Sequence, residues 1–195
     1  MRLVGFDTTM LSLLLNPHSK PPEDPRSQKP VTFPKKRAVY LLACIQKEKG
    51  KIIVPTPAVA EILTVIGPEA QAYFDIIAQN RLFDVAAFDP KAAIELAILN
   101  RDVFSTTDRK NNLEPYQKIK IDRQILAILK SRGVSEIYTD DVGLSNRARL
   151  CGITPIGIAE LRLPPDEQQM KLEFEGHEEI PQAEQPENMS DPDAS

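Results

Sequence analysis

Residues 3–7 have the sequence LVGFD, a short apolar run that ends in the carboxylate Asp7. A run of this length fits a buried strand, and the apolar segment 11–15 behind it has helical character. A carboxylate beside a core is costly unless it is paired or bound to a cation. Residues 137–141, IYTDD, repeat the arrangement, with Asp140 and Asp141 closing a second strand. Both stretches indicate strands that lead directly into functional carboxylates.

Strand-like and helix-like patterns alternate through residues 1–163. The predicted strands are 2–7, 51–54, 136–139 and 153–156, and 82–87 fits either a strand or an extended edge. Thr56 is expected to cap the helix that carries Glu61, with Pro57 at its first position. Asp122 is expected to open a helix that ends at Gly133, after a polar loop at 105–118. Such alternation predicts an α/β fold with a mostly parallel sheet and helices on both faces.

Two further segments differ from this pattern. Residues 16–36 contain six prolines and no periodicity, which predicts a long loop or insertion. Residues 164–195 hold ten acidic residues against the single base Lys171, a charge of −9. Because the whole chain carries −4, residues 1–163 carry about +5 (−4 minus −9). We therefore expect one domain at 1–163, mildly basic and compatible with a polyanion, and a disordered acidic tail at 164–195.

The acidic residues are expected to converge. Asp7 and the pair Asp140–Asp141 follow strands, and helices that follow parallel strands begin at the same edge of the sheet. Glu61 and Asp122, near predicted helix starts, can reach that edge. Oxygen ligands without nearby His or Cys favour Mg²⁺ or Mn²⁺, which predicts phosphate chemistry. Taken singly, each acid also fits an ordinary role as a helix cap, a turn residue or a solvated side chain.

Other classes of function find little support. His18 and His177, the two histidines, lie in the proline-rich segment and the tail, which argues against His-based catalysis and zinc sites. Neither a Gly-rich phosphate loop nor an apolar run long enough for a membrane span occurs. Cys44 and Cys151 lie beside apolar residues, so buried thiols are expected, with a single disulfide as the less favoured alternative, and a cytoplasmic location fits.

Residues 2–160 resemble the PIN-domain family of metal-dependent nucleases, which includes the VapC-type toxins. The matching motifs, in chain order, are VGFDTT at 4–9, VP at 54–55 leading to AEIL at 60–63, FDPKAA at 88–93, KID at 120–122, IYTDD at 137–141 and CGI at 151–153. The resemblance implies an α/β, PIN-like three-layer sandwich with a central, mostly parallel sheet. It also implies hydrolysis of RNA with Mg²⁺ or Mn²⁺.

The resemblance also assigns residues and partners. It matches Asp7, Glu61, Asp122 and Asp141 to the catalytic, metal-binding acids, with Asp140 as a neighbouring metal ligand. Thr8 or Thr9 would help to hold a metal-bound water. A homodimer and an antitoxin or other regulatory protein are the expected protein partners. Four basic residues near the Asp122 helix could contact RNA phosphates or be ordinary solvated charge, namely Lys110, Lys118, Lys120 and Arg123.

Two alternatives remain open. The chain could be a PIN-fold module that binds RNA or acts as a scaffold without catalysis. A haloacid-dehalogenase-like phosphatase is less favoured, because Thr9 occupies the place of that family's second Asp and no suitable Lys precedes Asp140.

Overall fold

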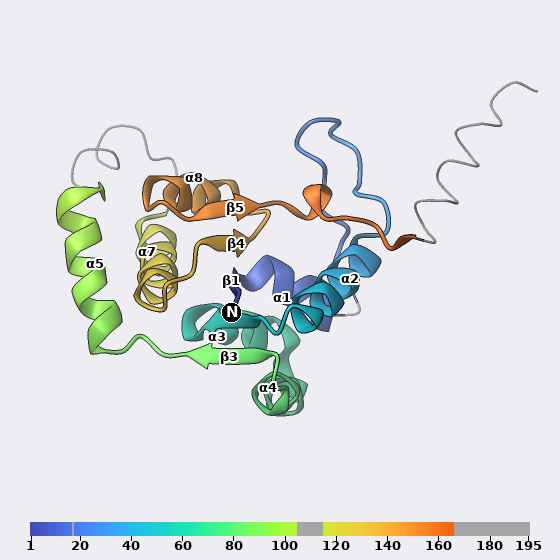
Figure 1. Cartoon of the computed structure of the whole chain (residues 1–195), viewed down its shortest axis with the longest axis horizontal. Coiled ribbons are helices and arrows are strands. Elements are labelled where there is room, and N and C mark those ends of the chain that lie inside the picture. The colour runs from blue at the N-terminus through green and yellow to red at the C-terminus, as the bar shows by residue number, and fades with distance from the viewer. Residues whose placement is uncertain (17, 105–114, 166–195) are drawn as a thin grey trace, which may run out of the picture. The chain divides into compact units, whose positions relative to one another are not determined.

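Five parallel strands form the centre of the molecule. The computed structural model describes residues 1–16, 18–104 and 115–165, and the first of its two units is Met1–Leu163. Its sheet has the order β3-β2-β1-β4-β5, with every neighbouring pair parallel (Figure 1). The strands are β1 (Leu3–Phe6), β2 (Lys51–Pro55), β3 (Phe83–Ala86), β4 (Glu136–Tyr138) and β5 (Thr154–Ile156). The predicted α/β class and parallel sheet are confirmed, and the ambiguous segment 82–87 supplies the edge strand β3.

Helices cover both faces of the sheet. They are α1 (Thr8–Leu15), α2 (Pro34–Lys47), α3 (Thr56–Ile66), α4 (Ala70–Gln79), α5 (Pro90–Asp102), α7 (Tyr116–Ser131) and α8 (Val142–Leu150), with short 3₁₀ turns η1 (Gly67–Glu69) and η2 (Ile158–Glu160). Figure 1 shows α1 and α2 on one side of the sheet and α5, α7 and α8 on the other. This is the predicted three-layer sandwich.

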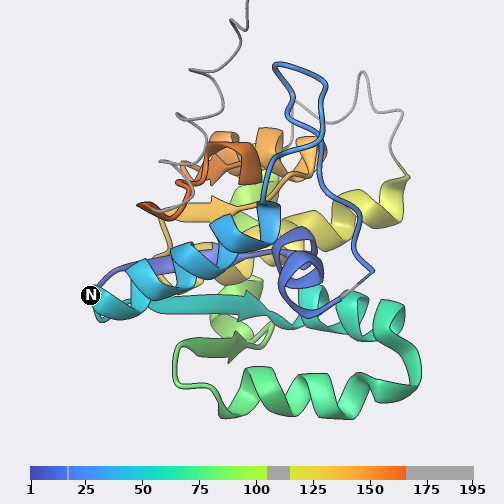
Figure 2. The same ribbon diagram turned by 90° about the vertical axis from the view of Figure 1, so that its right-hand side faces the viewer.

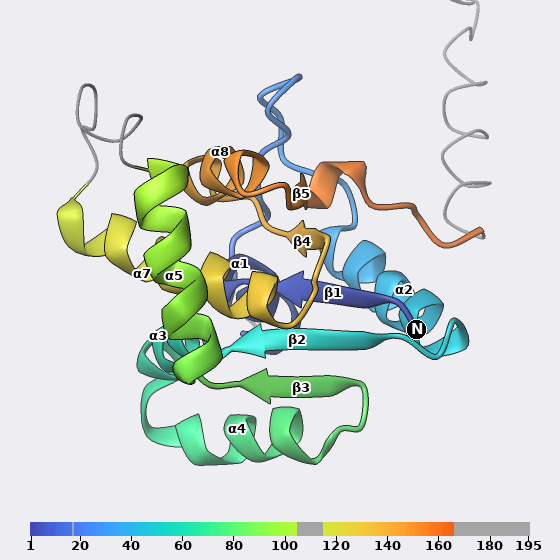
Figure 3. The same ribbon diagram turned by 60° about the vertical axis from the view of Figure 1, so that its left-hand side comes forward.

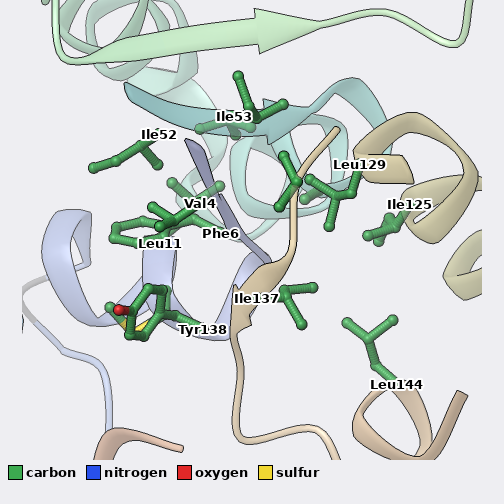
Figure 4. Packing of buried hydrophobic residues seen from close by; sticks show 14 of the residues in the cluster. Val4, Phe6, Leu11, Ile52, Ile53, Ile125, Leu129, Ile137, Tyr138 and Leu144 are labelled. Carbon is green, nitrogen blue, oxygen red and sulfur yellow. The ribbon is translucent and has the colours of Figure 1, made fainter. Parts of the chain in front are cut away.

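The strand pleat divides the core between the two faces. Val4 and Phe6 of β1 point toward Leu11 of α1, whereas Ile53 and Ile137 of the neighbouring strands point toward α7 (Figure 4). Strand side chains alternate with a period of two, so a central strand buried on both faces must be apolar throughout. Burial of each such side chain stabilises the fold by about 1.5–3 kcal/mol.

Gly5 sets how closely α7 approaches the sheet. A Cβ atom added at Gly5 would lie 2.7 Å from Leu129 Cδ1, closer than carbon atoms can approach. The absence of a side chain on β1 therefore lets α7 pack directly onto the central strand. This contact also positions Asp122, which lies two turns before Leu129 on the same helix.

Several predicted helix boundaries were wrong. Pro55, not Thr56, is the N-cap of α3, and its side chain offers no hydrogen bond. Helix α7 begins at Tyr116, so residues 116–118 are helical rather than loop, and Asp122 lies inside the helix rather than at its start. The end of the predicted loop 16–36 likewise belongs to α2, which begins at Pro34. Apolar periodicity predicted these helices, but the polar first turns of α2 and α7 made their starting residues hard to predict.

Three further predictions concern the cysteines, membrane-spanning segments and the acidic tail. Cys44 and Cys151 are free thiols, of which Cys151 is buried and Cys44 is half-buried. Within the described residues, no helix combines the length and apolar character that crossing a bilayer requires. The acidic tail, predicted to be disordered, covers residues 164–195. Of these, residues 166–195 lie outside the described part of the chain.

The parallel strands all end at one edge of the sheet. Figure 2 shows β1 and β2 running toward the side where α1 and α3 begin, and Figure 3 shows the strand arrows of β1–β4 aligned. Asp7 follows β1 directly, and Thr139, Asp140 and Asp141 follow β4. Ligands of open parallel sheets bind outside this edge.

Candidate active site

All five predicted acids line one cavity at the carboxyl edge of the sheet. The cavity has a volume of about 1000 Å³. Its carboxylates come from the ends of β1 and β4 and from the helices α3 and α7; they are Asp7, Glu61, Asp122, Asp140 and Asp141. Around them lie aliphatic side chains of α1, α3, α7 and α8, and the proline-rich segment contributes Ser19, Lys20 and Pro22. The predicted convergence of residues more than a hundred positions apart is therefore present.

Asp7 is the most buried and the most firmly held of these acids. Its Oδ1 accepts hydrogen bonds from the backbone N–H of Thr9 (3.0 Å) and Met10 (3.1 Å), which caps α1, and from Thr9 Oγ1 (2.7 Å). Its Oδ2 accepts a hydrogen bond from Thr139 Oγ1 at 2.5 Å. Burial raises the pKa of Asp7 to about 6, although these hydrogen bonds oppose the rise.

Asp122 forms a buried ion pair with Arg147 of α8. Arg147 Nη2 lies 2.6 Å from Asp122 Oδ2, and the two side chains are only 5% and 8% exposed. Burial raises the pKa of Asp122, and the guanidinium opposes that rise. A buried carboxylate needs such a partner, because an unpaired charge inside a protein costs several kcal/mol. Arg147 therefore holds Asp122 at the cavity wall.

Arg147 is a site residue absent from the sequence predictions, although the sequence carries a signal for it. Leu144, Arg147 and Ala148 are all buried and lie three and four positions apart on α8. An arginine on the apolar stripe of a helix requires a buried anion opposite it.

Asp141 has a different cation. Lys118 Nζ of α7 lies 2.6 Å from Asp141 Oδ2, while Asp141 Oδ1 caps α8 by accepting from the Leu144 N–H at 2.8 Å. Burial pushes the pKa of Asp141 upward, but Lys118 and the backbone donors outweigh it, so the pKa lies below its ordinary value. The Asp141 carboxylate in turn adds to the raised pKa values of Asp7 and Asp122. Asp141 thus lies close enough to repel both Asp7 and Asp122.

The side chain of Asp140 contacts the backbone of η2. Its Oδ1 accepts a hydrogen bond from the backbone N–H of Ile158 at 2.8 Å, which ties the end of β4 to η2. Its own N–H donates to Thr9 Oγ1 at 3.1 Å. Burial raises the pKa of Asp140. Of the two adjacent acids, Asp141 is the one whose charge acts on Asp7 and Asp122, and the side chain of Asp140 supports the loop.

Glu61 is the exposed member of the set. Its Oε2 accepts a hydrogen bond from Thr8 Oγ1 at 2.7 Å, which links α3 to the start of α1. Thr9 and Thr139 tie Asp7 to the loop after β4, since Thr139 Oγ1 also accepts the Asp141 N–H at 3.0 Å. Three threonine hydroxyls thereby fix the relative positions of the acids.

The fold has known counterparts. A chain of VapBC2 from Rickettsia felis, crystallised with a DNA fragment from its promoter, matches with a TM-score of 0.53 and 12% identity over 80% of this chain and 98% of that chain. A chain of the DNA-bound VapBC from Salmonella typhimurium gives a TM-score of 0.51 and 12% identity over 81% and 99%. The chain has a VapC-like PIN fold. No protein-family model and no curated protein matches the sequence.

The acids of this PIN fold suit a hard cation by chemistry, since every available donor is oxygen. Within residues 1–16, 18–104 and 115–165, however, no three His, Cys, Asp or Glu side chains lie close enough together to hold a metal ion as they stand. Lys118 and Arg147 instead supply positive charge to Asp141 and Asp122. A divalent ion would have to displace Lys118, whose side chain is 42% exposed.

The other predicted phosphate-binding bases lie elsewhere. Lys120 Nζ stacks 5.7 Å from the centroid of the Tyr116 ring, and Arg123 stacks over Phe104 at 4.6 Å. Arg123 also donates a hydrogen bond to Asn100 Oδ1 at 2.8 Å. Lys110 lies outside the described residues. Of the described residues among the four predicted bases, only Lys118 lines the cavity.

Replacing Lys118 by methionine is expected to raise the pKa of Asp141. The carboxylate stays partly buried after the substitution but loses the ammonium that lowers its pKa. Titration of the carboxyl carbons by NMR between pH 2 and 7 measures the change, with Lys120→Met as the control. Equal pKa values of Asp141 in the two variants would mean that the ion pair does not form in solution.

Proposed function

We propose that this protein is a metal-dependent nuclease that hydrolyses phosphodiester bonds in RNA. The observation that carries the proposal is the convergence of five carboxylates, from four separate parts of the chain, on one cavity of a PIN fold. The positive charge of about +5 on residues 1–163 supports a polyanionic substrate. The resemblance of the four motifs that carry the acids supports RNA as that substrate.

Asp7, Glu61, Asp122 and Asp141 would hold Mg²⁺ or Mn²⁺, with Asp140 beside them. When bound, such an ion would supply Lewis-acid activation of water and neutralise charge on the phosphate. The protein's own contribution is positioning. Arg147 holds Asp122 in place and opposes the rise of its pKa, and the threonine hydroxyls hold Asp7 in place. Lys118, once released from Asp141, is placed to contact a phosphate oxygen of the substrate.

We extend the proposal to a protein partner. The two structures with the PIN fold named above are VapBC complexes bound to DNA. On that basis, and on the resemblance to VapC-type toxins, an antitoxin is the partner that we propose for this chain. A homodimer stays an expectation from the same resemblance.

A non-catalytic RNA-binding module is the second candidate. The observation that favours it is the pairing of Asp122 and Asp141 with protein cations, which leaves no ready-made metal cluster among the described residues. Such a module would bind RNA through the positively charged residues 1–163 and would not cleave RNA at any metal concentration.

A cleavage assay separates the two candidates. The proposal predicts that the full chain cuts a labelled oligoribonucleotide with Mg²⁺ or Mn²⁺, and that excess EDTA abolishes cutting. Glu61→Gln is expected to slow cutting by at least roughly 100-fold, because it removes one charged ligand from the site. Glu69→Gln, just after the same helix and outside the cavity, is the matched control. Cutting that persists in EDTA, or equal rates for both variants, would contradict the proposal.

A further inference from the structure

The proline-rich segment forms a wall of the cavity. Ser19, Lys20 and Pro22 line it together with residues of α3 and α7. Sequence patterns assigned no role to residues 16–36, and the predicted acids lie on other elements. The segment therefore adds a second ammonium, besides that of Lys118, to the carboxylate cavity.

The segment is a folded hairpin. Its two arms are joined by the backbone hydrogen bond from Val31 N to Pro22 O (2.8 Å), and a β-bridge pairs Glu23 with Pro30. At the tip, Asp24 accepts hydrogen bonds from the Arg26 N–H (2.9 Å) and Ser27 Oγ (3.1 Å). Turns closed by an aspartate side chain in this way hold a defined conformation.

The hairpin is also attached to the body of the domain. The side chain of Val31 is 6% exposed and belongs to the hydrophobic core. Arg37 of α2 donates hydrogen bonds to the carbonyl oxygens of Thr32, at 2.9 Å, and Leu161. The hairpin thus leaves and re-enters the domain at fixed points, and its inner arm stays beside the cavity.

Prolines restrict the backbone at Lys20. Pro21 limits the residue before it to extended conformations, and each proline fixes its own φ near −65°. On the other side, Ser19 N donates to Asn16 O at 3.2 Å. The backbone of Lys20 is therefore held, although its side chain is exposed.

Lys20 differs from the other cations at the site. Lys118 and Arg147 are paired with Asp141 and Asp122, whereas Lys20 makes no hydrogen bond or ion pair with any described residue. A free ammonium at the rim of an anionic cavity suits a ligand that itself carries several negative charges. A polynucleotide has this property, because phosphates flank the one that is cut.

We infer that Lys20 is a positioning residue that binds a phosphate of the polynucleotide next to the one cleaved. The inference rests on the proposed nuclease function for the identity of the ligand. A phosphate held at the hairpin fixes the register of the strand over the acids. In that role the hairpin is part of the substrate site of this chain, and Lys20 sets where the strand lies.

Binding measurements test the inference without cleavage. A fluorescein-labelled oligouridylate is titrated with the full chain in an Asp7→Asn background, between 50 and 200 mM KCl. Lys20→Gln is expected to weaken binding and to reduce the slope of log K against log salt by about 0.7, the value for one phosphate contact on a single strand. Lys20→Arg is expected to restore the slope. Lys29→Gln, on the other arm of the hairpin and outside the cavity, is the matched control.

The outcomes separate this inference from the proposed function. Equal slopes for Lys20→Gln and Lys29→Gln would overturn the role of Lys20, even if the Asp7-containing protein cuts RNA with a metal ion. No measurable binding at 50 mM salt would overturn it as well. A slope change of about 0.7 in a protein that never cuts RNA would support Lys20 and reject the nuclease.

Discussion

Replacing Arg147 by methionine is expected to lower the free energy of unfolding by about 3–5 kcal/mol. The substitution leaves Asp122 without its partner, and the side chain of Asp122 is only 8% exposed. Methionine has a similar length and can fill the space, so the loss arises mainly from electrostatics. Urea denaturation followed by circular dichroism at pH 7 in EDTA measures the change.

A double variant identifies the cause. Combining Arg147→Met with Asp122→Asn removes both charges and is expected to recover a large part of the loss. Removing both charges costs far less than leaving one buried charge without its partner. Arg149→Met, an exposed position on the same helix, is the control and should change stability by less than about 0.5 kcal/mol. A double variant no more stable than Arg147→Met alone would show that Arg147 acts through packing instead.

The predictable part of the site follows from strands. Asp7 comes directly after strand β1, and Asp141 lies three positions after the last residue of β4, in a sheet covered on both faces. Parallel pairing then requires both residues to lie at one edge, whatever the details of packing. Local sequence and topology agree there, so sequence alone located these acids.

Asp122 shows where this reasoning fails. Its helix begins six residues earlier, at Tyr116. The predicted start was too late because the first turn of the helix is polar and looks like the preceding loop. The buried positions Ile119, Asp122 and Ile125 nevertheless follow one another at helical spacing. A carboxylate on that stripe points to a buried cation, but only the tertiary structure shows that α8 supplies it through Arg147.

The places of Lys20 and Lys118 in the cavity could not have been assigned from sequence, which offered Lys118 only as a phosphate contact or a solvated charge. Both are ordinary lysines in polar surroundings, and no local pattern tells which way a loop or a helix face turns. Lys118 reaches Asp141 because α7 and α8 pack together, and Lys20 reaches the cavity because Val31 anchors the hairpin. Long-range packing thus determines which cations reach the site, whereas the topology of the sheet determines where the acids lie.

Asp7→Asn is expected to abolish RNA cleavage, with a loss of at least roughly 1000-fold, and to leave the fold intact. Asparagine resembles the protonated carboxyl group in shape. Its oxygen can still accept the hydrogen bonds from Thr9 and Met10 that cap α1. What disappears is the negative charge of one of the acids that line the cavity. Asp75→Asn, on α4 and outside the cavity, is the control for the cleavage assay.

The same substitution has a predicted signature in stability. Because the pKa of Asp7 is about 6 in the folded chain and 3.8 in the reference state, its ionised form destabilises the fold above pH 6. That cost reaches about 3 kcal/mol at pH 7 and fades as the pH falls through 6 toward 4. In EDTA, Asp7→Asn should therefore unfold at the same or a higher urea concentration than the unsubstituted chain at pH 7, and the difference should shrink by pH 5. A variant that is inactive and also several kcal/mol less stable at pH 7 would mean that Asp7 serves the fold and not the chemistry.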